Sequence, residues 1–74
     1  MSIAEKIIRD IDNKIDNWNE RSMFTIKGVK NLSMADLDTI KLYAQTYARY
    51  ESFDGLMQPR GSVKEVLQAY GLID

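Results

Sequence analysis

Residues 33–52, SMADLDTIKLYAQTYARYES, decide the fold of this chain. The stretch opens on a serine whose hydroxyl can cap a helix, and an aspartate follows three positions later, where the helix dipole favours a carboxylate. Leu32 and Leu37 stand at the positions of a hydrophobic staple around this serine. The pattern predicts a helix from Met34 to about Ser52. Because aspartate is shorter than the usual Glu or Gln, we expect its capping box to be the least complete of three in the chain.

Apolar residues recur on this helix in two rows. One row consists of Leu37, Ile40, Ala44 and Tyr47, and the other of Ile40, Tyr43, Tyr47 and Tyr50. Two apolar rows on one helix indicate two packing partners. We therefore expect the helix over residues 34–52 to be the central one.

A first helix is predicted over residues 3–20. Ser2, followed three positions later by Glu5, supplies the start signal. The apolar seam then has spacings of four, three, four and three, and it consists of Ala4, Ile8, Ile11, Ile15 and Trp18. Ile3 and Ile7 widen this seam, so the helix presents a broad apolar face.

A third, short helix is predicted over residues 63–70. Ser62 and Glu65 repeat the capping signal, and Gly71 is placed to end the helix in a left-handed conformation. The core predicted from all three helices consists of Ile8, Ile11, Ile15, Leu37, Ile40, Ala44, Val66 and Leu67.

The segment between the first two helices is the least regular part of the sequence. Met23–Ile26 is compatible with a short strand or with an apolar loop tucked under the helices. Because no partner strand is evident, the loop is favoured. The predicted fold is therefore all-α: a single domain over residues 1–74, with three helices and an irregular apolar linker at 21–32.

The composition argues against several classes of function. The chain has 74 residues, no cysteine and no histidine, so a disulfide is excluded and a structural zinc site is not expected. The commonest general base and the strongest nucleophile are also missing, and no Gly-rich phosphate loop occurs, which argues against an enzyme. We expect no cofactor and no metal.

Targeting signals are also missing from the sequence. No apolar run approaches eighteen residues, and no secretion signal opens the chain. The net charge of −1 gives no general attraction to nucleic acid or to an anionic membrane. A cytoplasmic protein without a membrane partner is expected.

The tyrosines of the central helix are the best functional candidates. Tyr43, Tyr47 and Tyr50 follow one another at about one helical turn, with Arg49 beside them and Phe53 beyond. Such a stripe is typical of a half-buried core, but it could also anchor a protein interface or stack exposed bases. Together with the apolar face of the first helix, the candidate interface consists of Ile7, Ile11, Ile15, Trp18, Tyr43, Tyr47, Arg49, Tyr50 and Phe53.

Five basic residues are candidates for contacts with phosphate groups. They are Arg21, Lys27, Lys30, Arg60 and Lys64. Lys27 and Lys30 lie in a segment without acidic residues, Met23–Ser33, which Arg21 flanks. Arg60 and Lys64 flank the start of the third helix. A solvated surface is the ordinary interpretation of such residues, and DNA binding is the alternative.

Residues 37–57, LDTIKLYAQTYARYESFDGLM, resemble the central helix of a family of phage small terminase subunits. In that family an Asp-led helix carries a segment like Tyr47-Ala48-Arg49-Tyr50, and a later short helix ends in Gly-Leu, as Gly71-Leu72 does here. The resemblance implies a phage or prophage origin. It also implies a role in a DNA-packaging complex, since the family recognises viral DNA and assembles into rings.

These observations together predict a protein that acts by binding another protein and by associating with itself as a dimer or larger oligomer. A core of about 70–80 residues rarely gains more than ~3–5 kcal/mol without a staple. The short third helix cannot cover both the first helix and the tyrosine row, and exposed apolar surface of that size favours association. The alternative function is a DNA-binding component of a phage DNA-packaging complex.

Overall fold

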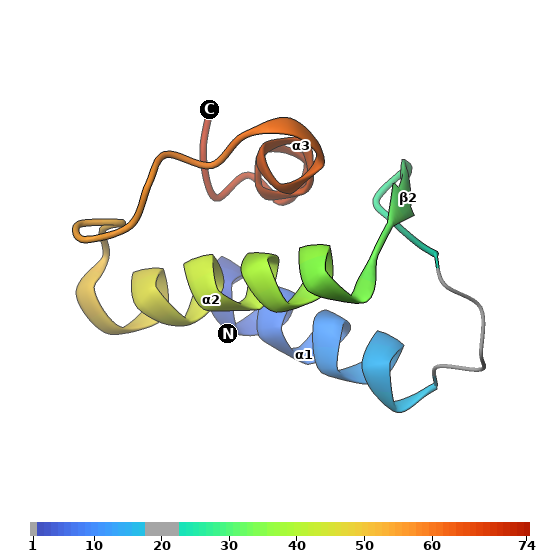
Figure 1. Cartoon of the computed structure of the whole chain (residues 1–74). Coiled ribbons are helices and arrows are strands. Elements are labelled where there is room, and N and C mark those ends of the chain that lie inside the picture. Colours follow the sequence, from blue (N-terminus) through green and yellow to red (C-terminus); the bar gives the residue numbers. More distant parts are fainter. Residues whose placement is uncertain (1, 18–22) are drawn as a thin grey trace.

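The computed structural model describes residues 2–17 and 23–74, which form three helices and a β-hairpin (Figure 1). The elements in chain order are α1 (Ile3–Asp16), β1 (Phe24–Ile26), β2 (Val29–Leu32), α2 (Met34–Tyr50) and α3 (Gly61–Tyr70). The chain is mostly helical, as predicted. It is not all-α, because part of the segment predicted as an irregular linker forms a two-stranded antiparallel sheet.

Helix α2 begins at the predicted residue and carries a complete capping box. The Ser33 hydroxyl accepts a hydrogen bond from the Asp36 amide at 3.1 Å, and the Asp36 carboxylate accepts one from the Ser33 amide at 2.9 Å. The expectation that this box would be the least complete was wrong, because the aspartate side chain does reach the amide of the cap. The helix ends at Tyr50, and Glu51 takes a left-handed conformation with φ of 55°.

We predict that Ser33→Ala lowers the free energy of unfolding by about 1 kcal/mol, because it removes the acceptor for one of the orphan amides of α2. Ser62→Ala is the matched control. Ser62 lies inside α3 and caps nothing, so its replacement should change stability by less than about 0.5 kcal/mol. Urea denaturation followed by circular dichroism measures both. Equal midpoints for Ser33→Ala and the unsubstituted protein would contradict the prediction.

Helix α1 is shorter than predicted. Its start is confirmed, since the Ser2 hydroxyl accepts a hydrogen bond from the Glu5 amide. It ends at Asp16, not at residue 20, because Asn17 caps it: the Asn17 amide and side-chain nitrogen both donate to the Asn13 carbonyl. The prediction that residues 18–20 are helical lies outside the described residues.

The buried face of α1 is turned slightly from the predicted seam. Ala4, Ile7 and Ile11 are buried, whereas Ile8 and Ile15 are only partly buried at the edge of the core. A helix with isoleucines at both of two adjacent positions can bury either one at its centre, and the neighbouring elements select Ile7 here.

The favoured loop over Met23–Ile26 was wrong, because Phe24–Ile26 pairs with Val29–Leu32. Lys27 and Gly28 connect the strands, both with positive φ, as a type I′ turn requires. Asn31, with φ of 63°, is the extra residue of a bulge between the pairs Phe24–Leu32 and Ile26–Val29. The partner strand was missed because Lys27-Gly28 is a weak turn signal and the bulge at Asn31 disturbs the alternation of the second strand.

Helix α3 begins at Gly61, so the predicted capping role of Ser62 was also wrong. The Lys64 amide bonds to the Arg60 carbonyl, which makes Arg60 the cap residue and puts Ser62 in the first turn. The predicted end is confirmed. Gly71 has φ of 85°, and the Leu72 amide bonds to the Leu67 carbonyl, which is the hydrogen bond of a Schellman motif.

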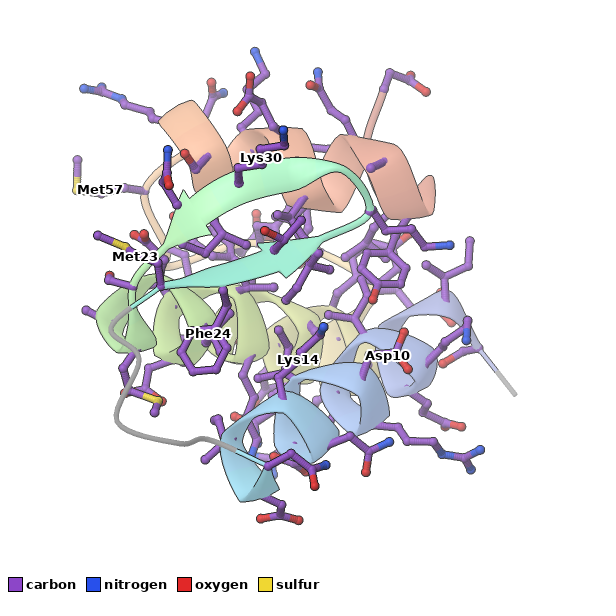
Figure 2. All side chains as sticks on the ribbon, turned by 90° about the vertical axis from the view of Figure 1, so that its right-hand side faces the viewer. Asp10, Lys14, Met23, Phe24, Lys30 and Met57 are labelled. Carbon is purple, nitrogen blue, oxygen red and sulfur yellow. The ribbon has the colours of Figure 1, made fainter. Side chains whose placement is uncertain are left out.

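The core lies around α2, which is placed between α1 and α3 (Figure 1). Six of the eight predicted core residues are buried, and Ile8 and Ile15 lie at the rim. The hairpin adds Ile26 and Leu32, which are 4% and 0% exposed. Figure 2 shows Phe24 pointing from the hairpin toward α1 and α2. The hairpin therefore adds to the core a layer that three helices alone would not supply.

A polar contact joins α1 to α3. The Tyr70 hydroxyl donates to the Asp10 carboxylate at 2.6 Å, and Lys6 lies 3.7 Å from the same carboxylate. Burial raises the pKa of Tyr70 well above the ordinary value of 10, and the hydrogen bond to Asp10 and its negative charge add to this effect.

We predict that the contact between Tyr70 and Asp10 makes the stability of the protein fall more steeply at alkaline pH. The unfolded tyrosine loses its proton near pH 10 while the folded one keeps it, so this stabilisation is complete below about pH 10 and is lost as the pH rises further. Between about pH 8 and about pH 11, the urea midpoint should fall further for the unsubstituted protein than for Tyr70→Phe. An equal fall in both proteins would contradict the prediction. Lysine side chains also lose protons in this pH range, but they do so in both proteins, so their effect on the midpoint cancels in the comparison.

Candidate protein-binding surface

The three tyrosines of α2 occupy three different environments. Tyr43 is 7% exposed, and its hydroxyl donates to the Met57 carbonyl in the loop before α3. The Phe53 ring contacts both Tyr43 and Tyr47, with centroids 5.6 Å and 5.3 Å apart. Tyr50 is 66% exposed. The stripe is thus core at Tyr43, half-buried at Tyr47 and surface at Tyr50.

The residues predicted as an interface are therefore not brought together on one surface. Ile7 and Ile11 fill the core of the chain itself and are 0% exposed, so they leave no area for a partner. Ile15 and Phe53 are partly buried against the same core. Trp18 lies outside the described residues. Of the predicted set, Arg49 and Tyr50 are exposed.

Another surface of α2 is exposed along most of the helix. Its residues follow one another at spacings of three, four, three and four, and all of them are exposed: Ala35, Asp38, Leu42, Gln45 and Arg49. We call these five residues the outer stripe. Such spacing places the side chains in one line along a helix. Leu42 is 47% exposed and is the large apolar residue of the stripe.

A shallow depression of about 530 Å³ lies over the later part of the outer stripe, where Leu42, Gln45 and Arg49 line it. Its lining consists of Ile8 from α1 and of Leu42, Gln45, Thr46, Ala48, Arg49 and Tyr50 from α2. The Arg49 guanidinium lies 6.0 Å from the centre of the Tyr50 ring, which is the geometry of a cation–π contact. Apolar side chains together with Arg and Tyr are a composition typical of binding surfaces between proteins.

The outer stripe carries opposite charges toward its two ends. Asp38 is in the second turn of α2, and Arg49 is in the last. Within residues 2–17 and 23–74 the ion pairs are Lys6–Asp10 and Lys41–Asp12, and neither charge of the stripe belongs to them. At 1.5 Å per residue, the two charges are separated by roughly 16 Å along the helix axis.

The outer stripe was missed in the sequence because it is not an apolar pattern. Leu42 is its one large apolar residue, and the other members are alanine or polar. A signal was nevertheless present, since Leu42 falls outside both apolar rows of the helix. A leucine outside the buried rows of a central helix has either a third packing partner or solvent around it.

The candidate phosphate contacts lie mostly on the hairpin and α3. Lys27 is over the Tyr70 ring, 5.1 Å from its centre; Arg60 is exposed at the cap of α3, and Lys64 is exposed on the helix itself. Figure 2 shows Lys30 on the hairpin next to α3, against which β2 packs. Arg21 lies outside the described residues. Glu65 follows Lys64 directly and places an acidic side chain next to it.

Two further properties of the described residues bear on function. Among them, no group of three or more acidic, histidine or cysteine side chains is arranged to hold a metal ion. None of the helices in this part of the chain combines the length and the apolar character needed to span a bilayer.

Comparisons with known protein families, with curated proteins and with solved structures found no match to this chain.

Proposed function

We propose that this protein acts by binding protein partners through the outer stripe of α2 and the depression over it, and not as an enzyme. The observation that carries the proposal is Leu42, which remains 47% exposed on the central helix while α1, α3 and the hairpin cover the rest of the core. Exposed apolar residues scattered singly need no explanation. Here Leu42 shares one depression with Tyr50 and Ile8.

Self-association remains part of the proposal, but it now has a different basis. The sequence argument relied on apolar surface that the third helix could not cover. The hairpin, which that argument did not include, buries Ile26 and Leu32 in the same core. The surface left for association is the smaller one on α2. A modest apolar area supports a reversible complex and not a permanent one.

A capture experiment with two matched variants tests the proposal. Leu42→Asp places a charge in the depression, whereas Met57→Asp places the same charge at another exposed apolar residue, 71% exposed, in the loop before α3. Immobilised protein, Leu42→Asp and Met57→Asp are incubated with extract of the native host. We expect the unsubstituted protein and Met57→Asp to retain the same proteins, and Leu42→Asp to lose them. Retention by all three would overturn the proposal.

A DNA-binding role in a phage packaging complex is the second candidate. Its support is the placement of Lys30 on the hairpin beside α3, which carries Lys64, and the sequence resemblance of residues 37–57. Binding through phosphates weakens steeply with added salt, whereas binding through Leu42 should not. If duplex DNA binds at about 50 mM salt and is released at about 200 mM, and Lys30→Glu lowers that affinity, this second candidate is favoured.

A further inference from the structure

We propose that the partner of the outer stripe is the same stripe of a second copy, with the two α2 helices antiparallel and Asp38 of each copy facing Arg49 of the other. This inference rests on the proposed function, because it assigns an occupant to the same surface. It goes further by fixing the direction of packing and the residues that meet.

The spacing of the stripe allows this arrangement. From Asp38 the spacing to Leu42, Gln45 and Arg49 is four, three and four, which reads the same in both directions. Two such helices running in opposite directions therefore match residue for residue about a two-fold axis. Along the seam, Asp38 of one copy faces Arg49 of the other, and Leu42 faces Gln45. The two-fold axis then repeats both pairs with the copies exchanged. Alternating spacings of three and four are also those of a helix–helix seam.

The charges select the antiparallel direction. In a parallel pair with the same register, Asp38 would meet Asp38 and Arg49 would meet Arg49, so both ends of the seam would be repulsive. In the antiparallel pair both ends are attractive. Because Asp38 and Arg49 take part in none of the ion pairs of the described residues, neither charge has to break an ion pair within that part of the chain.

The surroundings of the stripe also suit a second copy. Leu42 and Gln45 both line the depression, and a second α2 helix placed there would cover the exposed part of Leu42 together with the Gln45 side chain. Tyr50 and Ile8 flank the depression and widen the contact beyond the two helices. Lys41, next to the stripe, is held by Asp12 at 2.6 Å and so does not leave an unpaired charge at the contact.

Charge exchange tests the arrangement directly. Asp38→Arg makes both ends of the homodimer doubly positive, and Arg49→Asp makes both ends doubly negative. We expect each variant alone to dimerise at least tenfold more weakly than the unsubstituted protein, and the mixture of the two to form a heterodimer of restored affinity. The protein carrying both changes should dimerise again, because it reverses each pair. Sedimentation equilibrium over micromolar to millimolar concentrations, at low salt, gives the dissociation constants.

Matched controls separate the pairing from a general effect of charge. Asp54→Arg and Arg60→Asp make the same exchanges at exposed residues outside α2 and should leave the dissociation constant within about twofold. Circular dichroism melting curves show whether each variant is folded.

The outcomes distinguish this inference from the proposed function. If the protein dimerises but Asp38→Arg and Arg49→Asp change nothing, or if their mixture forms no heterodimer, the antiparallel arrangement is overturned while protein binding through Leu42 stands. A strict monomer at millimolar concentration overturns the inference and the self-association. Binding of other partners is then decided by the Leu42→Asp and Met57→Asp capture experiment alone.

Discussion

Leu37→Ala should lower the free energy of unfolding by about 3 kcal/mol, whereas Leu42→Ala should lower it by less than about 0.5 kcal/mol. Both leucines lie on α2 and lose the same atoms. Leu37 is 0% exposed, so its truncation leaves a cavity in the core, while Leu42 is 47% exposed and leaves none. A core of this size rarely supplies more than about 3–5 kcal/mol, so Leu37→Ala should leave only a small part of the stability of the fold.

Urea denaturation at a low protein concentration measures this pair without interference from self-association. The comparison also tests the rotation of α2 about its own axis. If the two variants lost equal stability, Leu42 would have to be packed against protein in the single chain, and the outer stripe would not be a free surface. If Leu37→Ala were nearly neutral, the hydrophobic staple with Leu32 would be wrong.

Tyr43→Ala should be nearly as damaging, with a loss of about 3–4 kcal/mol. The Tyr43 ring is buried against Phe53, and its hydroxyl donates to the Met57 carbonyl, so this one side chain fixes the loop between α2 and α3 to the core. Tyr43→Phe keeps the ring and removes only the hydroxyl. It should therefore lose about 1 kcal/mol, the usual net contribution of one hydrogen bond.

Tyr50→Ala is the matched control for Tyr43→Ala, since it removes the same atoms from a side chain that is 66% exposed. It should change stability by less than about 0.5 kcal/mol. Thermal unfolding of the four proteins, followed by circular dichroism, gives the order of stability. A large effect at Tyr50 together with a small one at Tyr43 would show that the two tyrosines have been assigned to the wrong environments.

Local signals in the sequence were sufficient for the start of α2 and for the end of α3. Ser33 and Asp36 satisfy each other's amides within four residues, and Gly71 reverses the chain without help from distant residues. The hairpin could not be predicted with equal ease, because its turn is Lys27-Gly28 and not the strong Asn-Gly or Asp-Gly signal. The bulge at Asn31 also disturbs the alternation that identifies a strand.

The candidate site was harder to predict than the fold, because burial depends on what packs against each face. Tyr43 and Tyr50 lie on one helix and have the same chemistry, yet one is core and the other is exposed. The choice between Ile7 and Ile8 as the centre of the α1 face is of the same kind. Which of two such residues is buried depends on how α1, α3 and the hairpin are placed around α2. A local sequence pattern carries no information about that placement.

The small sheet has a consequence for how the protein avoids aggregation. A sheet of two strands has an outer edge on each strand, and an unpaired edge can recruit a strand from another molecule. Here β1 and β2 span only Phe24–Ile26 and Val29–Leu32, the Asn31 bulge distorts the second edge, and Lys30 places a charge on it. Short, bulged and charged edges are poor templates for strand addition. The hairpin can therefore cover the core without opening a route to fibrillar assembly.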